Sequence, residues 1–289
     1  MHVLHKLIRY ARKSPREQLQ KVRAIVDYHL VERGWKVPHL GNDRTAYVIG
    51  LFGSGRWYIN GLVLENIGER AKYFRDVVHF RFHFGPTSMI YSGHATMRHD
   101  SWGHRSPAET SRILEGVRSR FADLIFINRH PFDALLTNWI WLRTFAREKR
   151  MITGISQLYK NTDDLCAELE QNFLEFKAFA EGDAGFFAVL PAPRFMSFRE
   201  FVEEIELFRQ SATLPLRLED FMIDPLKEFS KIVEVMSVDL DLSNLQVARP
   251  RTKPYGYLAV KEKVPRFRDF IDGLDVETKR RIEKIGYNL

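Results

Sequence analysis

Residues 46–57 read AYVIGLFGSGRW, and this stretch decides the fold that we expect. Its apolar first half is typical of a buried strand, which runs into a glycine-rich turn and then into a helix. Gly50 and Gly55 have the spacing of a phosphate-binding P-loop. A nucleotide triphosphatase continues that loop with Lys and then Ser or Thr, whereas this chain has Arg56 and Trp57. Backbone N–H groups can still bind a phosphate at the helix N-terminus, but we do not expect ATP hydrolysis.

The composition limits the kind of protein. With 289 residues, 45% of them hydrophobic, the chain can bury a large core in one α/β domain or in two smaller ones. The net charge of +7 favours anionic partners such as nucleotides, acidic glycans or membrane surfaces. The basic residues do not form the runs that are typical of nucleic-acid binding, so we expect no nucleic-acid partner.

Cysteine usage and hydropathy indicate the compartment. Cys166 is the single cysteine, which excludes an intrachain disulfide and a cysteine-ligated metal cluster and favours a reducing compartment. No apolar run in the sequence reaches the length of a transmembrane span, and the first residues lack the apolar core of a signal peptide. We therefore expect a cytoplasmic protein. Residues 1–13 form a basic amphipathic stretch that can contact an anionic membrane peripherally.

Short apolar strands alternate with helical segments along the chain. This pattern predicts an α/β fold with a mostly parallel central sheet flanked by helices on both faces. The expected strands are residues 46–52, 76–80, 88–91, 123–128, 186–190 and 214–218. The expected helices are residues 55–67, 107–119, 133–149, 162–181, 198–210, 225–237 and 275–285. Capping boxes begin at Ser14, Ser106 and Ser197, and we expect one domain over residues 1–289 with residues 1–35 as an N-terminal helical extension.

Residues 123–139, DLIFINRHPFDALLTNW, form the second informative segment. A buried strand is expected to end at Asn128, which puts Arg129 at its tip and Thr137 one turn into the following helix. Ligands of parallel sheets bind at the carboxyl ends of the strands. The guanidinium and the hydroxyl can converge there on one phosphate, the first as a bidentate clamp and the second as a further donor. The ordinary alternative is that Arg129 pairs with a carboxylate and Thr137 bonds locally.

The two segments together resemble the sulfotransferases that use 3′-phosphoadenosine 5′-phosphosulfate (PAPS). In that family the first loop is often K/R-S-G-T-T, and Ser54 and Gly55 match its S-G. The later motif R-x-P-x-D-x-x-x-S matches from Arg129 to Thr137, with Thr in place of the final Ser. Residues 216–225, LRLEDFMIDP, are similar to the family's Y-E-D-L-x-x-D-P segment. The three matches occur in the family's order.

The resemblance implies PAPS as the sulfuryl donor, no metal ion, and a P-loop-like strand–loop–helix unit. The residues that it assigns to the nucleotide are Gly53, Ser54, Gly55, Arg56, Trp57, Arg129, Thr137, Arg251 and Lys253. Ser54, Gly55 and Arg56 are expected to hold the 5′-phosphosulfate, and Arg129 and Thr137 the 3′-phosphate. Arg251 and Lys253 belong to a late basic segment, residues 249–257, of the kind that closes over the nucleotide in this family.

The first loop departs from the family at the residue that usually stabilises the leaving oxygen. Gly53 replaces the basic residue before Ser-Gly, and Arg56 and Trp57 replace the two threonines. Arg56 is our candidate for the catalytic cation because it lies three residues away on the same loop. Its ordinary role is that of a surface arginine in the first helical turn, where a cation is slightly unfavourable against the helix dipole.

Sulfuryl transfer also needs a base, because the acceptor hydroxyl loses a proton as its oxygen attacks sulfur. Histidine has a pKa suited to that role near neutral pH. His94 follows an expected strand between the two phosphate motifs, where the base of this family commonly lies. His99 and Asp100 are the alternatives. The resemblance is to the glycan-modifying branch, so the expected acceptor is a carbohydrate or a glycolipid.

Two other functions are the alternatives. A P-loop kinase that acts on a small molecule would need Lys and Ser or Thr at positions 56 and 57, and a requirement for Mg²⁺ would favour it. A nucleotide-binding protein without catalytic activity is the second, since Gly53 lacks the usual basic side chain. Nucleotide binding without turnover would favour this non-catalytic alternative.

Overall fold

The computed structural model describes most of the chain in a series of separate ranges. These are residues 44–51, 54–67, 72–75, 81–83, 88–94, 111, 114–115, 123–148, 161–183, 197–236, 240–244, 247 and 256–289. The capping boxes expected at Ser14 and Ser106, and the extension expected over residues 1–35, lie outside them. The single domain over residues 1–289 stays a prediction.

The described residues form one sheet of six strands in the order β2-β3-β4-β1-β5-β6. The strands are β1 (Arg44–Gly50), β2 (Lys72–Arg75), β3 (Arg81–His83), β4 (Ser88–His94), β5 (Asp123–Asn128) and β6 (Leu214–Arg217). β1 pairs in parallel with β4 and β5, and β5 pairs in parallel with β6. β3 is antiparallel to β2 and β4. The pairing around β1 is therefore parallel, as in α/β proteins.

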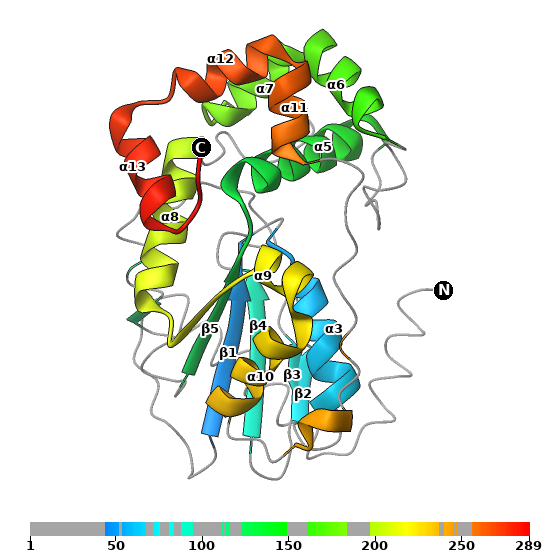
Figure 1. The fold of residues 1–289 in the computed structure, drawn as a ribbon, viewed down its shortest axis with the longest axis vertical. Coiled ribbons are helices and arrows are strands. Elements are labelled where there is room, and N and C mark those ends of the chain that lie inside the picture. Colours follow the sequence, from blue (N-terminus) through cyan, green and yellow to red (C-terminus); the bar gives the residue numbers. More distant parts are fainter. Residues whose placement is uncertain are drawn as a thin grey trace, which may run out of the picture.

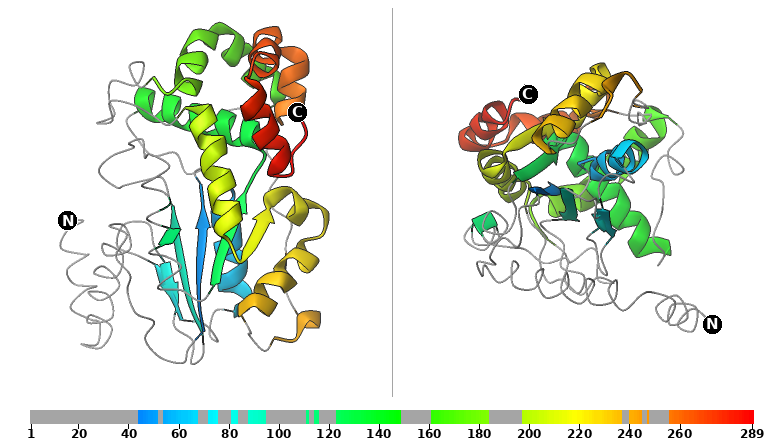
Figure 2. Two further views of the ribbon diagram at one scale, coloured as in Figure 1. Left: turned by 90° about the vertical axis from the view of Figure 1, so that its left-hand side faces the viewer. Right: turned by 90° about the horizontal axis from the view of Figure 1, so that it is seen from below.

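Within the described ranges, the helices follow β1, β5 and β6 along the chain. They are α3 (Arg56–Ile67), α5 (Pro131–Glu148), α6 (Thr162–Gln171), α7 (Phe173–Ala180), α8 (Phe198–Ser211), α9 (Leu218–Ile223), α10 (Pro225–Met236), η3 (Leu242–Asn244), α11 (Tyr257–Lys263), α12 (Pro265–Asp272) and α13 (Val276–Lys284). Figure 1 shows α5, α6, α7, α11 and α12 beyond the ends toward which the parallel strands point. The view from below in Figure 2 shows α3 and α10 on the same side of the sheet.

Every residue of β5 is buried, and its side chains alternate between two separate apolar cores. Ile125 and Ile127 belong to the core that contains α3, α9 and α10. Leu124 and Phe126 belong to the core that contains α5 and α8. Continuous burial of this kind is typical of a parallel strand with helices on both sides. The expected α/β class is confirmed, and helices over both faces of the whole sheet stay a prediction.

Aromatic residues and one buried arginine hold the helices beyond the sheet. Trp139 of α5 is fully buried and meets Phe176 of α7 edge-on, with 5.7 Å between the ring centres. Arg143, also buried on α5, donates hydrogen bonds to Glu168 of α6 (2.8 Å) and Glu175 of α7 (2.5 Å). These contacts fix α6 and α7 against α5.

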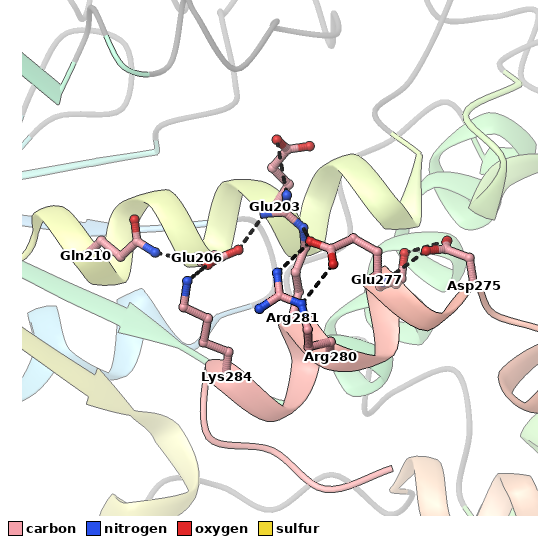
Figure 3. Close-up of polar contacts among 9 residues, drawn as sticks. Glu203, Glu206, Gln210, Asp275, Glu277, Arg280, Arg281 and Lys284 are labelled. Atoms are coloured by element: carbon pink, nitrogen blue, oxygen red, sulfur yellow. Dashed lines mark hydrogen bonds and ion pairs between the residues drawn. The ribbon is translucent and has the colours of Figure 1, made fainter.

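Figure 3 shows the polar cluster that docks α13 on α8. Glu206 of α8 is buried and accepts hydrogen bonds from Arg281 (2.5 Å) and from Lys284. Burial, the largest single effect, raises the pKa of Glu206, but the hydrogen bonds and charges of Lys284 and Arg281 together hold it below its usual value. Arg281 also contacts Glu277 within α13 (2.9 Å). The cluster fixes the last helix of the chain to α8.

Several expected boundaries are confirmed and others are wrong. The strand expected over residues 123–128 and the capping box at Ser197 are confirmed. The strand expected to end at residue 91 continues to His94, so His94 ends β4 rather than following it. The helix expected from residue 133 already begins at Pro131, because proline at the first helical position loses no intrahelical hydrogen bond.

The helix expected over residues 162–181 is interrupted at Asn172. The Asn172 side chain donates to the C=O of Glu168 (2.8 Å), and its backbone leaves the helical region, with φ of −120° and ψ of 29°. The sequence did not predict α9, α11 or α12, which are short. Other expected elements lie wholly or mostly outside the described ranges, namely residues 76–80, 107–119 and 186–190.

Candidate nucleotide site

The candidate site lies where the chain changes its direction of travel across the sheet. After β1 the chain enters α3 and goes on to the side of β2 to β4, whereas after β5 it enters α5 and goes on to β6. α3 packs in one core and α5 in the other, so the two turns leave neighbouring strands toward opposite faces. In open α/β sheets, ligands bind outside the carboxyl ends of the strands at such a point.

The turn between β1 and α3 is tight and depends on a glycine. The N–H of Ser54 donates to the C=O of Leu51 (3.1 Å), and α3 begins two residues later. Gly55 has φ of +88°, in the left-handed region, and a Cβ atom there would lie 2.7 Å from both Cδ atoms of Leu218. Glycine is therefore favoured at this position by backbone conformation and by close approach to α9.

Ser54 carries a buried hydroxyl that has no hydrogen-bond partner among the described residues. The residue is 3% exposed and lies in the turn just before α3. Buried polar groups of native proteins are nearly always paired, so an orphan hydroxyl indicates a missing ligand or another special role. The first N–H groups of a helix also lack intrahelical partners and bind anions. The turn thus has two kinds of donor for a phosphate.

The turn after β5 brings Arg129 and Thr137 into contact with each other. Nη1 of Arg129 donates to the hydroxyl of Thr137 (3.3 Å), and Nη2 lies 3.6 Å from the carboxylate of Asp133. The Thr137 hydroxyl donates to the C=O of Asp133 (2.7 Å). The ordinary local contacts are therefore present as well, and they hold the guanidinium at the end of β5. They use two of the five N–H donors of an arginine, so the group can still bind an anion.

His130 is the centre of a buried polar network that no motif predicted. Its backbone N–H donates to Glu219 (2.8 Å), and its ring Nε2 lies 3.1 Å from the C=O of Asn288. The ring stacks on Tyr257, with 3.9 Å between the ring centres. Its Nδ1 has no hydrogen-bond partner in the described part of the chain. These contacts assign the proton to Nε2, which makes the neutral ring a donor to Asn288.

Tyr287 joins this network from the C-terminal end. Its hydroxyl accepts a hydrogen bond from Asn128 (3.0 Å) and donates one to Glu219 (3.1 Å). Burial and the Glu219 carboxylate raise the pKa of Tyr287, so its hydroxyl stays protonated. Asn128 in turn accepts from Arg209 (3.2 Å). The partners of Tyr287 lie 159 and 68 residues away in sequence, which is why no local spacing predicted them.

The structure describes the other expected site residues only in part. His94 is the last residue of β4 and pairs with Gly50 at the end of β1, so its backbone lies beside the start of the turn between β1 and α3. Arg56 and Trp57 open α3, and their backbone alone is described, as is that of His94. The expected residues outside the described ranges are Gly53, His99, Asp100, Arg251 and Lys253.

Comparison with known proteins does not indicate a function, so the inference of function depends on the candidate site. No protein-family model matches the chain, and no curated protein matches it significantly. Within the described ranges, no group of three or more His, Cys, Asp or Glu residues is placed to hold a metal ion. None of the described helices combines the length and the apolarity needed to span a lipid bilayer.

Two glycines of this region are expected to respond in opposite ways to substitution. Gly55→Ala forces a side chain into the left-handed region and against Leu218, so the free energy of unfolding should fall by about 1–2 kcal/mol. Gly61 lies within α3, and no atom of the described residues comes within 4 Å of the position that its Cβ would take. Gly61→Ala should therefore raise stability by about 0.5–1 kcal/mol. Urea unfolding of both variants checks this, and equal shifts would contradict the described turn.

The buried environment of His130 makes stability depend on pH. Burial is the largest effect on the pKa of His130, and it lowers that pKa. The C=O of Asn288 and the charge of Asp133 raise the pKa, the charge of Arg129 lowers it, and the net result is a pKa below the usual value. The tyrosine rings that stack on His130 and meet its edge are neutral near pH 7. In the unfolded chain the same imidazole has a pKa of about 6.5, so it binds a proton more readily in the unfolded state than in the folded state. The free energy of unfolding therefore falls as the pH drops below about 6.5.

His130→Gln isolates this effect, because glutamine keeps a donor near the Asn288 carbonyl and does not titrate. Between about pH 7 and pH 5 the unmodified protein should lose more stability than the variant, since the other titratable groups are common to both. Thermal melting at the two pH values measures the difference. Parallel losses in the two proteins would show that His130 has the same proton affinity in the folded and unfolded states.

Proposed function

We propose that the chain is a PAPS-dependent sulfotransferase. It transfers the sulfuryl group of PAPS to a hydroxyl of a carbohydrate or glycolipid. The catalytic unit is a mostly parallel central sheet flanked by helices on both faces. The burial of β5 between two cores supports this fold, and the residues at the two turns support the activity.

One observation carries the proposal: the two candidate phosphate sites end neighbouring parallel strands. Gly50 at the end of β1 pairs with Ile127 near the end of β5, and paired strands lie about 4.8 Å apart. The turn that contains Ser54 and the turn that contains Arg129 therefore lie at the same edge of the sheet. A nucleotide with phosphates on both its 5′ and 3′ positions suits such a pair. A nucleoside triphosphate, with one chain of phosphates, would leave one of the turns unused.

The proposed binding roles follow from the chemistry of each turn. The Ser54 hydroxyl and the backbone N–H groups at Gly55 and the start of α3 bind the 5′-phosphosulfate. Arg129, already oriented by Asp133, binds the 3′-phosphate together with Thr137. Four further residues enter the nucleotide site on the family resemblance alone: Gly53, Trp57, Arg251 and Lys253.

The reaction needs a base for the acceptor and a cation for the leaving group. The acceptor oxygen forms a bond to sulfur as the bond from sulfur to the bridging phosphate oxygen breaks. His94 takes the proton of the acceptor hydroxyl, and Arg56 stabilises the charge that develops on the bridging oxygen. The products are the sulfated acceptor and 3′-phosphoadenosine 5′-phosphate (PAP). No step in this scheme requires a metal ion.

The proposal also includes a compartment. Cys166 is the single cysteine of the chain and is a buried free thiol on α6, which fits a reducing environment. We therefore propose the cytoplasm, with peripheral contact between the basic residues 1–13 and an anionic membrane.

PAP binding without metal is the direct test of this function. At about 100 times its Kd, PAP should stabilise the protein by about 2.7 kcal/mol and raise its melting temperature by several degrees. Ser54→Ala removes the orphan hydroxyl, so it should weaken PAP binding by about tenfold or more while leaving the melting temperature of the free protein nearly unchanged. Ser197→Ala is the control: it removes the N-cap of α8 and should lower stability without changing PAP affinity.

Each rival function predicts a different outcome in the same assay. A larger shift with ATP and Mg²⁺, and none with PAP, would contradict the proposal and favour a kinase. PAP binding without transfer from PAPS to any hydroxyl acceptor would favour a nucleotide-binding protein without catalytic activity. Loss of stability in Ser54→Ala would show that its hydroxyl already has a structural partner.

A further inference from the structure

The end of α13 turns the chain back toward the sheet. The N–H of Tyr287 bonds to the C=O of Ile282 (3.1 Å), and the N–H of Gly286 bonds to that of Glu283 (2.9 Å). Gly286 has φ of +87°, as expected for the glycine that ends a helix in a Schellman motif. We call residues 286–289 the C-terminal strap. Figure 1 shows α13 and the C-terminus on the side toward which the strands point.

The C-terminal strap contacts the residues on both sides of Arg129. The hydroxyl of Tyr287 accepts from Asn128 (3.0 Å), and the C=O of Asn288 lies 3.1 Å from Nε2 of His130. Asn128 is 1% exposed and His130 is 7% exposed, so neither side chain can exchange these partners for water without moving. The backbone that carries Arg129 is therefore fixed before and after it.

A second set of contacts joins the C-terminal strap to the guanidinium of Arg129 through Tyr257 and Asp133. The C=O of Asn288 also accepts from the hydroxyl of Tyr257 (3.2 Å). The N–H of Tyr257 donates to Oδ1 of Asp133 (2.8 Å), and Oδ2 of the same carboxylate lies 3.6 Å from Arg129. Asp133 thus joins α11 to the first turn of α5, and its carboxylate orients the guanidinium of Arg129.

The C-terminal strap reaches the other phosphate turn through α9. The hydroxyl of Tyr287 donates to one oxygen of Glu219 (3.1 Å), while the other oxygen accepts from the backbone of His130 (2.8 Å). Arg217 donates to the C=O of Gly286 (2.7 Å). Leu218, between Arg217 and Glu219, is the residue against which Gly55 packs. One carboxylate therefore links the turn after β5 to the start of α9, and α9 supports the turn after β1.

From these contacts we infer that the C-terminal strap positions the two phosphate-binding turns relative to each other, with Tyr287 and His130 as positioning residues for Arg129. The inference rests on the proposed function, because it assigns the fixed guanidinium to the 3′-phosphate. It goes further by giving the last residues of the described chain a role in nucleotide recognition that acts through Arg129.

Tyr287→Phe tests the inference because it removes the hydroxyl and keeps the ring that packs on His130 and Arg217. Hydrogen exchange without nucleotide should become about tenfold faster in residues 129–137 of the variant. Its affinity for PAP should fall by about tenfold, with a smaller fall for adenosine 5′-monophosphate, which has no 3′-phosphate. Ile271→Val is the control, since it loosens a buried site of α12 outside the C-terminal strap and should leave the preference for PAP unchanged.

The outcomes separate this inference from the proposed function. Unchanged exchange in residues 129–137, or an equal loss of affinity for the two nucleotides, would overturn the positioning role of Tyr287. If the unmodified protein binds neither nucleotide, the proposed function fails. In that case faster exchange in Tyr287→Phe would still show that the C-terminal strap orders the turn after β5, and unchanged exchange would refute it.

Discussion

The parallel pairing of β1 with β5 fixes where the two turns of the candidate site lie. β5 is buried along its whole length, and alternate residues serve two different cores. The helix after β1 lies in one core and the helix after β5 lies in the other. The turns that follow these strands must therefore leave one edge of the sheet in opposite directions, which is the arrangement that α/β proteins use to bind ligands. The position of both turns of the candidate site follows from this pairing.

Polar groups at the buried strand ends impose a second constraint, because each must find a partner. Asn128 binds Tyr287 and Arg209, and Glu219 binds the backbone of His130 as well as Tyr287. The C-terminal strap satisfies groups that β5 and β6 leave at their ends. Against this background the Ser54 hydroxyl is an exception in the described part of the chain. Its place beside a helix N-terminus is why we interpret it as a ligand group rather than as a packing defect.

Local patterns predicted the α/β class and several elements of the fold, and they indicated candidate site residues whose function stays a proposal. The apolar run of β5 and the capping box at Ser197 act over a few residues, so the sequence shows them directly. Arg129 and Thr137 are eight residues apart and meet because a turn and a helix bring them together. Interactions over long separations were invisible to the same reasoning, as with His130 and Asn288, which are 158 residues apart. The glycine after α13 was a readable signal for the end of that helix, but it does not reveal which strand the following residues contact.

A crystal structure of the protein with bound PAP tests whether the two turns form a nucleotide site. We expect the 5′-phosphate to lie within hydrogen-bonding distance of the Ser54 hydroxyl and the first N–H groups of α3. We expect the 3′-phosphate to contact Arg129 and Thr137, with the nucleotide spanning the ends of β1 and β5. A nucleotide bound elsewhere, or one whose 3′-phosphate points away from Arg129 into solvent, would contradict the account.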